Sequence, residues 1–588
     1  MQRAIVIILL LLSNQLFSQE IVNGDFEILN SKNLPRTWNV YKEDNNYTVT
    51  ADFQNKYSGK TAIHIDGTNV KNASPQNNLI FANVFGAIST KAVNKIEISA
   101  YLNVPAKKDS AISIFIQDFS SKKIIREYFP GNSKGGWQKL SLTYNIPPNE
   151  KWYGFYYGTE LSKNIDFRID NFTLKVDEKT IEDPKAFNYD VSPQELSLLN
   201  KNLIPLDKNF KSDDFSDVKK LSNFLGKSKI IGVGEPTHGT SEASKFKLHL
   251  LQYLVEKKGF TTFAMEEVIP VCDSMNAIIN NPQISLKESL QNLSFYKCWK
   301  TEEVLTLLEW IRNYNLSHKK KIRFIGIDME DSWLKNSLAE LSKYQNAYAY
   351  YPEILNNIEN LKKLNKEQKF EDALTLAGEI IEDFNKFSKA VQESKTLSAE
   401  DKFTAQTYIR VSNQWLSNRF TQTQDKTRDQ YMAENIEYYF KNHSDEKIML
   451  WAHNLHIANI SLPQKAMGAF LKDMFVVNYL PIGFTSASGS YLAAEDNSQK
   501  IWKSYAIEPA YKGTYESILK TAKSDFYFLK TNSSNNAEWL NIPMLELDNG
   551  YIYTGEDDYK FLGNPINKLF DGLVFCKQTN ASKSVIAK

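Results

Sequence analysis

The sequence predicts a multidomain protein, with an N-terminal all-β sandwich followed by an α/β domain that has a mainly parallel sheet and a helical insertion. Three observations lead to this fold class. At 588 residues and 42% hydrophobic content, the chain is too long for one ordinary core. Runs in which apolar and polar residues alternate fill its first part. Apolar runs separated by helical stretches fill the rest.

Residues 1–18 are predicted to be a signal peptide that is removed on export. Met1-Gln2-Arg3 is followed by an apolar run over residues 4–12, and the small residue Ser18 precedes Gln19. A membrane anchor is the alternative, but spanning a bilayer takes about 20 apolar residues. No later stretch is long and apolar enough to cross a membrane. We therefore expect a periplasmic or secreted protein without a transmembrane segment.

Residues 20–177 are predicted to form the β-sandwich. Apolar and polar side chains alternate in runs such as 96–98, 112–114 and 167–169, as they do in strands with one buried face. Glycine, asparagine and proline separate these runs, and helical periodicity is absent. Two packed antiparallel sheets account for this pattern.

The same segment resembles the jelly-roll modules of carbohydrate-binding type. The motifs that carry the resemblance are Asn23-Gly24-Asp25-Phe26-Glu27, Gly136-Trp137-Gln138-Lys139 and Ile169-Asp170-Asn171-Phe172. The resemblance implies a contact with a glycan. The rings of Trp152, Tyr153, Tyr156 and Tyr157 fit sugar stacking, but aromatic residues are also common in sandwich cores.

Residues 178–192 are predicted to be a linker, because they carry charges, Pro184 and no apolar periodicity. The remaining residues, 193–588, are predicted to form the α/β domain. Its buried strands are expected at 229–233, 261–265, 322–327 and 448–451. Between the last two of these strands, residues 334–442 have a helical spacing and almost no glycine. That stretch is predicted to be an inserted helical subdomain that shapes a cleft wall.

Chemically reactive side chains follow each of these four strands. They are Glu235 and His238 after the first strand, Glu266 after the second, Asp328 after the third, and His453 and His456 after the fourth. In a parallel sheet the carboxyl ends of the strands lie along one edge, where ligands bind. We therefore expect these groups to form one site.

His238 is the leading candidate for a catalytic base, because it lies in a tight turn bounded by glycines. An imidazole can take a proton from water near neutral pH, and a carboxylate on its other nitrogen can orient it. Glu235 or Glu266 could supply that carboxylate. The alternative is that His238 only caps or braces the turn.

Six ordered blocks between about residues 229 and 575 resemble the erythromycin esterase family. The blocks are GEPTHGTSE at 234–242, LLQYLVE at 250–256, WKTEE at 299–303, IGID at 325–328, RDQYMAEN at 428–435 and WAHNLH at 451–456. The resemblance implies an esterase-type hydrolase that cleaves an ester or lactone with histidine-activated water, without a metal or cofactor. Macrolide lactones are the best-known substrates of some members, which links the family to antibiotic resistance.

The resemblance also implies roles by position. The base, the active-site carboxylates and a further catalytic group would be His238, then Glu235 and Glu266, then one of His453 and His456. The family pattern has an arginine on the first helix where this sequence has Lys247. Lysine keeps the positive charge but cannot make a bidentate contact. Lys247 or Arg428 is expected to bind the substrate or to stabilise its oxyanion.

Two other interpretations of these residues stay open. His453 and His456 lie three apart and could bind zinc with Glu235 or Glu266, which would make the protein a zinc-dependent hydrolase. Alternatively, the cleft binds a ligand without turnover, and the sandwich anchors the protein to glycans. A serine nucleophile is not supported, because no Gly-x-Ser-x-Gly elbow precedes a helix.

Charge and cysteine content disfavour two further classes. Lys and Arg total 70 against 69 Asp and Glu, without a basic or acidic tail, so a nucleic-acid partner is not expected. The three cysteines are an odd number for an exported chain, so no disulfide framework is expected to hold the fold.

The expected partner, which the family resemblance implies, is a small-molecule ester or lactone.

Overall fold

The structure is a computed structural model that describes residues 22–586 with short gaps. The gaps are residues 31, 43–45, 70–78, 89–93, 105–111, 119–121, 132–134, 147–151, 162–164, 184, 212, 421–425, 462–464, 533–536, 554–557 and 562. The predicted signal peptide, 1–18, lies outside the described residues, and so does Pro184 of the predicted linker. In the part of the chain that is described, no helix has both the length and the hydropathy needed to cross a bilayer.

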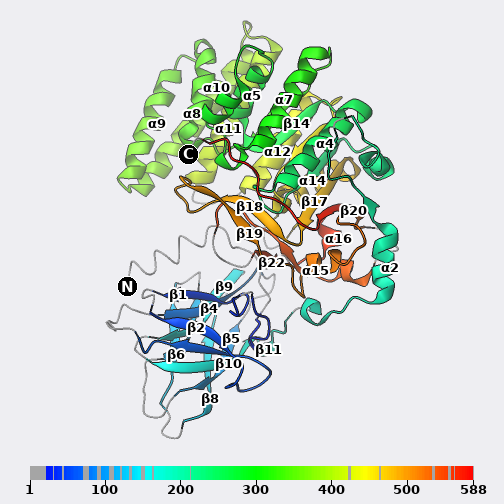
Figure 1. The fold of residues 1–588 in the computed structure, drawn as a ribbon. Helices are drawn as coiled ribbons and strands as arrows, with labels where there is room; N and C mark the ends of the chain where they lie inside the picture. Colours follow the sequence, from blue (N-terminus) through cyan, green and yellow to red (C-terminus); the bar gives the residue numbers. More distant parts are fainter. Residues whose placement is uncertain are drawn as a thin grey trace.

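Two antiparallel sheets form the N-terminal part of the chain, as predicted (Figure 1). One sheet has the strand order β1-β4-β9-β6-β7, and the other has β2-β3-β10-β5-β8 with β11 paired to β10. The strands are β1 Asn39–Lys42, β2 Thr48–Asp52, β3 Ala62–Asp66, β4 Leu79–Ile88, β5 Lys95–Asn103, β6 Ile112–Asp118, β7 Ile124–Tyr128, β8 Trp137–Asn145, β9 Trp152–Leu161, β10 Asp166–Val176 and β11 Lys179–Thr180.

The alternation in the sequence arises because the inner faces of the two sheets enclose a core. In β5 every second side chain is buried. Within the core, Trp38 stacks on Phe81 with ring centroids 4.8 Å apart. Tyr157 is part of this core, so its ring packs between the sheets and cannot stack on a sugar. The side chains of Trp152 and Tyr153 lie outside the described residues.

The predicted linker, 178–192, makes more contacts than its composition suggests. Its first residues form β11, and the 3-10 helix η2 (Lys185–Asn188) packs Ala186 into the core of the α/β domain. Ser192 then caps α2 (Pro193–Asn202) through a capping box with Glu195. Sequence periodicity misses such contacts, because each buries only one or two side chains.

An eight-stranded sheet forms the centre of the second domain, in the order β12-β20-β23-β17-β13-β16-β14-β15. The strands from β23 to β15 are parallel, whereas β20 is antiparallel to β23 and β12 is antiparallel to β20. The four strands predicted from the sequence are the neighbours β13, β16, β14 and β15, which confirms the mainly parallel sheet. The bounds are β12 Ile204–Pro205, β13 Ile230–Val233, β14 Thr262–Val268, β15 Arg323–Asp328, β16 Ile448–Trp451, β17 Tyr479–Ser486, β20 Phe526–Lys530 and β23 Gly572–Cys576.

Helices cover both faces of this sheet. The successive β13 residues Ile230 and Ile231 belong to different hydrophobic clusters, so both faces of the strand are buried. The α-helices around the sheet are α3 Ser222–Leu225, α4 Ser241–Lys258, α5 Ile269–Ile279, α6 Leu286–Asn292, α7 Glu302–Ser317, α12 Arg428–Asn442, α13 Asn454–Ile457, α14 Met467–Phe475, α15 Tyr515–Leu519 and α16 Ile566–Leu569. The 3-10 helices are η3 Val218–Leu221, η4 Lys297–Trp299, η5 Ser332–Leu334, η6 Ser342–Ala347, η7 Val476–Asn478 and η8 Glu538–Asn541.

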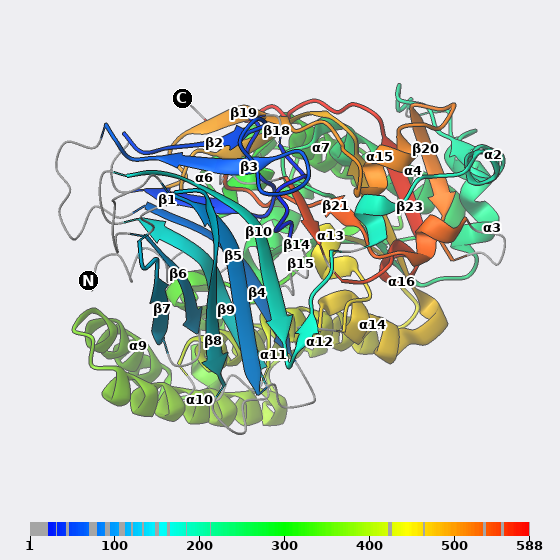
Figure 2. The ribbon, with the colours of Figure 1, turned by 90° about the horizontal axis from the view of Figure 1, so that it is seen from below.

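Helices with a hydrophobic core of their own lie between β15 and α12, in the stretch where the insertion was predicted (Figure 1). They are α8 Lys335–Leu341, α9 Tyr351–Lys366, α10 Phe370–Glu393 and α11 Ala399–Arg419. Ser398 caps α11 by accepting a hydrogen bond from the N–H of Asp401. In Figure 2, α9 and α10 run side by side at the edge of the molecule.

Two small antiparallel ribbons lie between the sandwich and the large sheet (Figure 1). They are β18 Gly489–Ala494 with β19 Trp502–Ile507, and β21 Leu545–Leu547 with β22 Tyr559–Phe561. The N–H of Leu492 in β18 donates a hydrogen bond to the carbonyl oxygen of Gly239. The ribbons therefore reach the carboxyl edge of the large sheet, where the candidate residues lie.

Candidate active site

The turn between β13 and α4 carries the candidate base. At Gly234 and Gly239 it is packed so closely that no side chain fits. A Cβ atom on Gly234 would lie 2.1 Å from Oδ1 of Asn454. One on Gly239 would lie 2.0 Å from the carbonyl oxygen of Leu492. The main chain on both sides of His238 is thus held against neighbouring elements, which restricts where the imidazole can lie.

Glu235 orients His238 within this turn. Nδ1 of the imidazole lies 2.9 Å from Oε1 of Glu235, and the ring packs against Trp299 with centroids 4.7 Å apart. Nε2 has no hydrogen-bond partner among the described residues, and the side chain is 11% exposed. Because an ionised carboxylate only accepts hydrogen bonds, Nδ1 carries the proton. In the neutral tautomer with its proton on Nδ1, the lone pair lies on Nε2, where a ligand can use it.

Glu235 is fully buried, and its neighbours favour the ionised form. Its Oε2 accepts hydrogen bonds from Nζ of Lys247 at 2.6 Å and from Nε1 of Trp451 at 3.0 Å. Burial disfavours the negative charge, but Lys247 and then His238 outweigh burial, so the pKa of Glu235 lies below its ordinary value. An ionised Glu235 is what keeps the proton of His238 on Nδ1.

The structure corrects the expected role of Lys247. Its side chain has no exposed surface, and Nζ lies behind Glu235, 4.2 Å from the ring centroid of Trp451. A substrate cannot reach this ammonium group, so Lys247 does not stabilise an oxyanion. Helix α4 packs this face onto the sheet, and the lysine instead neutralises the buried carboxylate.

A second cluster lies at the carboxyl ends of β14 and β15. Arg428, the first residue of α12, donates to both oxygens of Asp328 and from Nη2 to Oε1 of Glu266 at 3.0 Å. The other oxygen of Glu266 accepts the N–H of His453 at 3.0 Å. Nη1 of Arg428 lies 3.3 Å from Nε2 of His456 but contacts no carboxylate within the described part of the chain, and the side chain is 29% exposed. The guanidinium therefore keeps a donor for a ligand.

His456 is held as an imidazolium between two carboxylates. Nδ1 lies 2.9 Å from Oδ1 of Asp429, and Nε2 lies 3.2 Å from Oε1 of Glu266. Burial by itself lowers the pKa of His456, but the carboxylates outweigh burial and raise it to about 10. Conversely, His456 and then Arg428 outweigh the burial of Glu266 and hold its pKa well below the ordinary value. At neutral pH, His456 cannot act as a base.

His453 is a neutral ring that supports the turn. As the N-cap residue of α13, it accepts the N–H of Leu455 at Nδ1. Nε2 lies 3.2 Å from the carbonyl oxygen of Pro236 and 3.1 Å from that of Asn549, so its N–H donates to the main chain. Burial lowers the pKa of His453, and its ring centroid lies 5.1 Å from that of His238. Of the three imidazoles, His238 is the one with a ring nitrogen that contacts no hydrogen-bonding group in the described part of the chain.

The zinc-dependent alternative does not match this geometry. Both ring nitrogens of His456 face carboxylates, and both of His453 bond to the main chain. Across the described residues, no group of three or more His, Cys, Asp or Glu side chains is arranged to hold a metal ion. The two histidines therefore do not converge on a common ligand.

The segment after β21 belongs to the site but was not predicted from the sequence. Asn549 reaches the site through its main chain, donating its N–H to the carbonyl oxygen of Pro236 at 2.7 Å. The ring of Tyr551, which is 36% exposed, lies 6.3 Å from that of His238. Main-chain contacts leave no residue pattern, so only the nearby aromatic side chain could have drawn attention to this segment.

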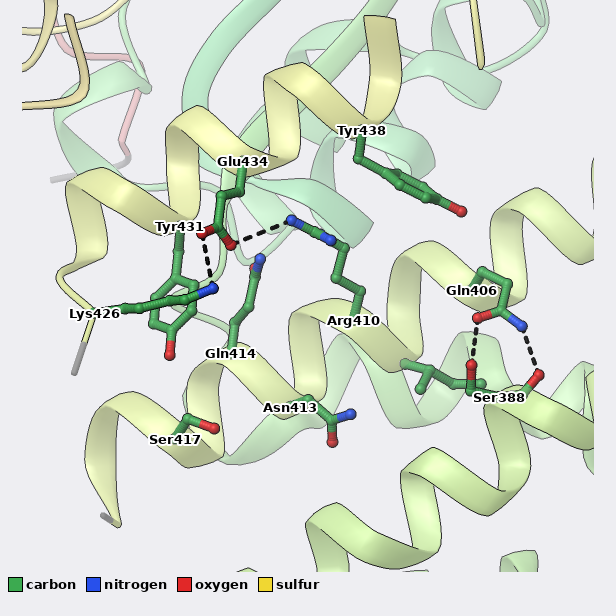
Figure 3. Close-up of a pocket in the computed structure, with 11 residues that line it drawn as sticks. Ser388, Gln406, Arg410, Asn413, Gln414, Ser417, Lys426, Tyr431, Glu434 and Tyr438 are labelled. Carbon is green, nitrogen blue, oxygen red and sulfur yellow. Dashed lines mark hydrogen bonds and ion pairs between the residues drawn. The ribbon is translucent and has the colours of Figure 1, made fainter. Parts of the chain in front are cut away.

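A cavity of about 560 Å³ lies outside this site, between α12 and the helices α10 and α11 of the insertion (Figure 3). Its two cations, Arg410 and Lys426, both contact Glu434. Helix α12 links the two places, because Arg428 at its start lies in the site while Tyr438 near its end lines the cavity. Since the cavity's charges pair with one another, we place the chemistry at the sheet edge.

Comparisons with known proteins point to one family. The model of the erythromycin esterase family matches residues 255–579. Erythromycin esterase type II of Escherichia coli is 26% identical over 319 residues, which cover 49% of this chain and 75% of that protein. Erythromycin esterase type I of Escherichia coli is 22% identical over 304 residues, which cover 46% of this chain and 73% of that protein.

The fold agrees with these matches. A solved structure of a mutant of the erythromycin esterase EreC, in its open conformation, superposes with a TM-score of 0.50 at 16% identity. It covers 66% of this chain and 100% of that one. The family match spans more than half of the chain and supports a hydrolase. The chain belongs to the erythromycin esterase family.

Proposed function

We infer that this hydrolase cleaves an ester or lactone with water activated by His238. The observation that carries this inference is the pairing of a buried, ionised Glu235 with Nδ1 of His238, while Nε2 bonds to none of the residues that the structure describes. That arrangement suits a general base. A macrolide-like lactone is the substrate that the names of the relatives suggest.

The reaction follows from these positions. Nε2 of His238 takes a proton from water while the water oxygen bonds to the carbonyl carbon, and the carbonyl oxygen becomes an oxyanion. Nη1 of Arg428, which is not committed to a carboxylate among the described residues, donates to that oxyanion. The imidazolium then returns the proton to the leaving oxygen as the carbon–oxygen bond breaks, which yields an acid and an alcohol. Glu235 stabilises the imidazolium throughout.

Replacing His238 tests the proposal. His238→Ala should lower kcat by about 10² to 10⁴ on any ester that the wild type accepts, because the general base is lost. The variant also loses the hydrogen bond to buried Glu235, so its melting temperature should fall, and the rates are compared at a temperature where both proteins are folded. The measurement is hydrolysis of a panel of aryl esters and macrolides. His318→Ala, at the exposed end of α7, is the matched control and should keep wild-type rates.

The alternatives have distinct outcomes in the same assay. Wild-type rates in His238→Ala would overturn the assignment of the base. Activity that disappears with a chelator and returns with zinc would favour the zinc-dependent hydrolase. A wild-type protein that binds macrolides but is inactive on every ester would favour the ligand-binding alternative.

We propose that the protein is exported. The apolar run at residues 4–12 and the small residue Ser18 support cleavage before Gln19. Expression of the full chain in a bacterium with a Sec pathway should give a product outside the cytoplasm whose mass begins at Gln19. A full-length chain that stays in the cytoplasmic fraction would contradict export.

We also propose that the sandwich contacts a glycan through Tyr57, Tyr101 and Trp137. Tyr57, which is 43% exposed, stacks on Tyr101 with centroids 3.6 Å apart, and Trp137 lies edge-on to Tyr57. The buried carboxylate of Asp170 accepts the N–H groups of Tyr57 and Ser58 and so anchors their loop. Fixed aromatic rings beside polar groups suit the apolar face of a pyranose ring.

The glycan contact is tested by affinity electrophoresis in gels that contain neutral polysaccharides. Trp137→Ala and Tyr57→Ala should abolish any retardation shown by the wild type. Tyr128→Ala removes an aromatic ring that is 51% exposed but lies outside the group, and it should leave retardation unchanged. Equal retardation of all variants would place the contact elsewhere.

A further inference from the structure

A continuous series of hydrogen bonds joins the sandwich to the catalytic turn. We propose that Arg36 of the sandwich is a positioning residue for His238, acting through Glu508, Asp558 and Asn549. The sandwich would then be a fixed part of the catalytic unit. The inference rests on the proposed function, because it concerns the reaction at His238.

The first link is a buried ion pair between the two domains. Nη1 and Nη2 of Arg36 each lie 3.0 Å from a different oxygen of Glu508, and the two side chains are only 4% and 16% exposed. The guanidinium carbon also lies 3.1 Å from the ring centroid of Tyr511. Within the sandwich, Arg36 donates its N–H to Ile28 and Nε to the carbonyl oxygen of Leu29. Because the pair is bidentate and held in both domains, it fixes the relative orientation of the Arg36 and Glu508 side chains as well as their distance.

The second link runs from Glu508 to the loop after β21. The N–H of Glu508 donates to Oδ2 of Asp558 at 2.6 Å. The other oxygen of Asp558 accepts Nδ2 of Asn549 at 2.8 Å, and its main-chain oxygen accepts the N–H of Asp548 at 3.0 Å. The hydroxyl of Tyr559, the residue after Asp558, also donates a hydrogen bond to the carbonyl oxygen of Glu508 at 2.9 Å. Asp558 is buried, so these bonds are shielded from water.

The third link joins that loop to the catalytic turn. Asn549 donates its N–H to the carbonyl oxygen of Pro236, two residues before His238. The carbonyl oxygens of both Asn549 and Pro236 lie within hydrogen-bond distance of Nε2 of His453. Asp548 lies 3.3 Å from the same nitrogen. The loop after β21 thus contacts both the main chain of the catalytic turn, at Pro236, and the ring of His453, which lies beside His238.

These contacts make the position of the base depend on domain docking. A displacement of a catalytic group by about 1 Å can cost about 10² in rate even when the mutation lies far away. Without Arg36, the loop loses one of its fixed ends, and the Pro236 peptide can shift with it. We therefore expect kcat to change more than KM, because substrate binding does not involve Arg36. A purely structural pair would lower stability without changing kcat of the folded enzyme.

The test uses the full chain with Arg36→Gln, Glu508→Gln and the double variant. Arg36→Gln should lower kcat on an accepted aryl ester by about tenfold or more, at a temperature where every variant is folded. The double variant should be no slower than the worse single variant, because both remove the same link. Arg126→Gln removes a bidentate pair with Glu160 elsewhere in the sandwich and is the matched control. It should keep wild-type kcat.

A second readout does not depend on turnover. Diethyl pyrocarbonate modifies unprotonated imidazole nitrogens, and Nε2 of His238 bonds to no described residue. Mass spectrometry of the modified peptide should show a changed rate at His238 in Arg36→Gln but not in Arg126→Gln. That change in a protein inactive on all esters would support the positioning role while removing the proposed function. If the wild type cleaves esters, an unchanged kcat in Arg36→Gln overturns the inference. If it cleaves none, an unchanged modification rate of His238 in that variant overturns it.

Arg36→Lys covers the case in which Arg36→Gln fails to fold. Lysine keeps the charge but makes one contact instead of two. Its kcat should lie between those of the wild type and Glu508→Gln. Wild-type kcat in both Arg36→Lys and Glu508→Gln would overturn the positioning role.

Discussion

His238, His453 and His456 lie in one site, but their hydrogen bonds give them different roles. His238 has a carboxylate on Nδ1 and an open Nε2. His453 donates to main-chain oxygens, and His456 is charged between two carboxylates. Chemically identical imidazole rings take different roles because their neighbours favour different protonation states. The sequence led us to expect a catalytic role for one of the last two histidines, but in the structure both nitrogens of each ring already face protein groups, which come from distant segments.

The raised pKa of His456 predicts a pH dependence of stability. Its folded-state pKa of about 10 lies above the ordinary value of about 6.5, so the folded protein binds the proton more tightly. The stabilisation is complete below about pH 6.5 and is lost as the pH rises through 10. The difference in unfolding free energy between wild type and His456→Gln should therefore shrink between pH 6 and pH 10.5, as measured by urea denaturation.

Asp429→Asn provides the comparison for that experiment. The variant keeps His456 but removes the carboxylate next to Nδ1. The decline of its stability between pH 6 and pH 10.5 should be shallower than in the wild type. Parallel stability curves for wild type, His456→Gln and Asp429→Asn would show that His456 is not charged by its neighbours.

At the scale of elements, the catalytic turn depends on glycines that leave no room for a side chain. The Cβ atom of Gly239→Ala would lie 2.0 Å from main-chain oxygen of β18, which cannot move as freely as a side chain. Gly239→Ala should cost about 1–3 kcal/mol of stability and lower kcat, because the turn that carries His238 is displaced. Thermal unfolding and ester hydrolysis measure the two effects.

Gly378→Ala is the control for this substitution. Gly378 lies in the middle of α10 on its exposed side, and apart from the neighbouring backbone of its own helix no described atom lies within 4 Å of an added Cβ atom. Alanine is favoured over glycine in a helix by about 1 kcal/mol, so this variant should be slightly more stable with unchanged kcat. If Gly239→Ala behaved in the same way, the close packing of the turn would not matter.

Element prediction succeeded where the periodicity is strong and failed where the contacts are short. The buried runs of β13, β14, β15 and β16 and the helical stretch between the last two were found from the sequence. Residues 178–192 were predicted only as a linker, and the short elements β11 and η2 within them, which pack on the domains to either side, were not predicted. The role of Lys247 was missed because periodicity does not show that α4 turns this residue toward a buried carboxylate.

At the scale of the whole molecule, the sandwich and the α/β domain have separate hydrophobic cores. The Arg36–Glu508 pair is a buried contact between them. The ribbons β18–β19 and β21–β22 lie between the domains and also border the catalytic turn (Figure 1). A domain that sequence analysis treats as an independent module is thus placed where it can influence the site.

The sequence by itself determined the order of the domains, the mainly parallel sheet, and the residue types that meet at its edge. Those properties follow from local periodicity and from the rule that parallel strands end on one side. The tertiary structure alone decided which imidazole has an open nitrogen, that Lys247 is buried, and that Asn549 joins the site. These depend on hydrogen bonds between residues far apart in the sequence, such as 235 with 451 and 236 with 549, and local periodicity does not encode such contacts.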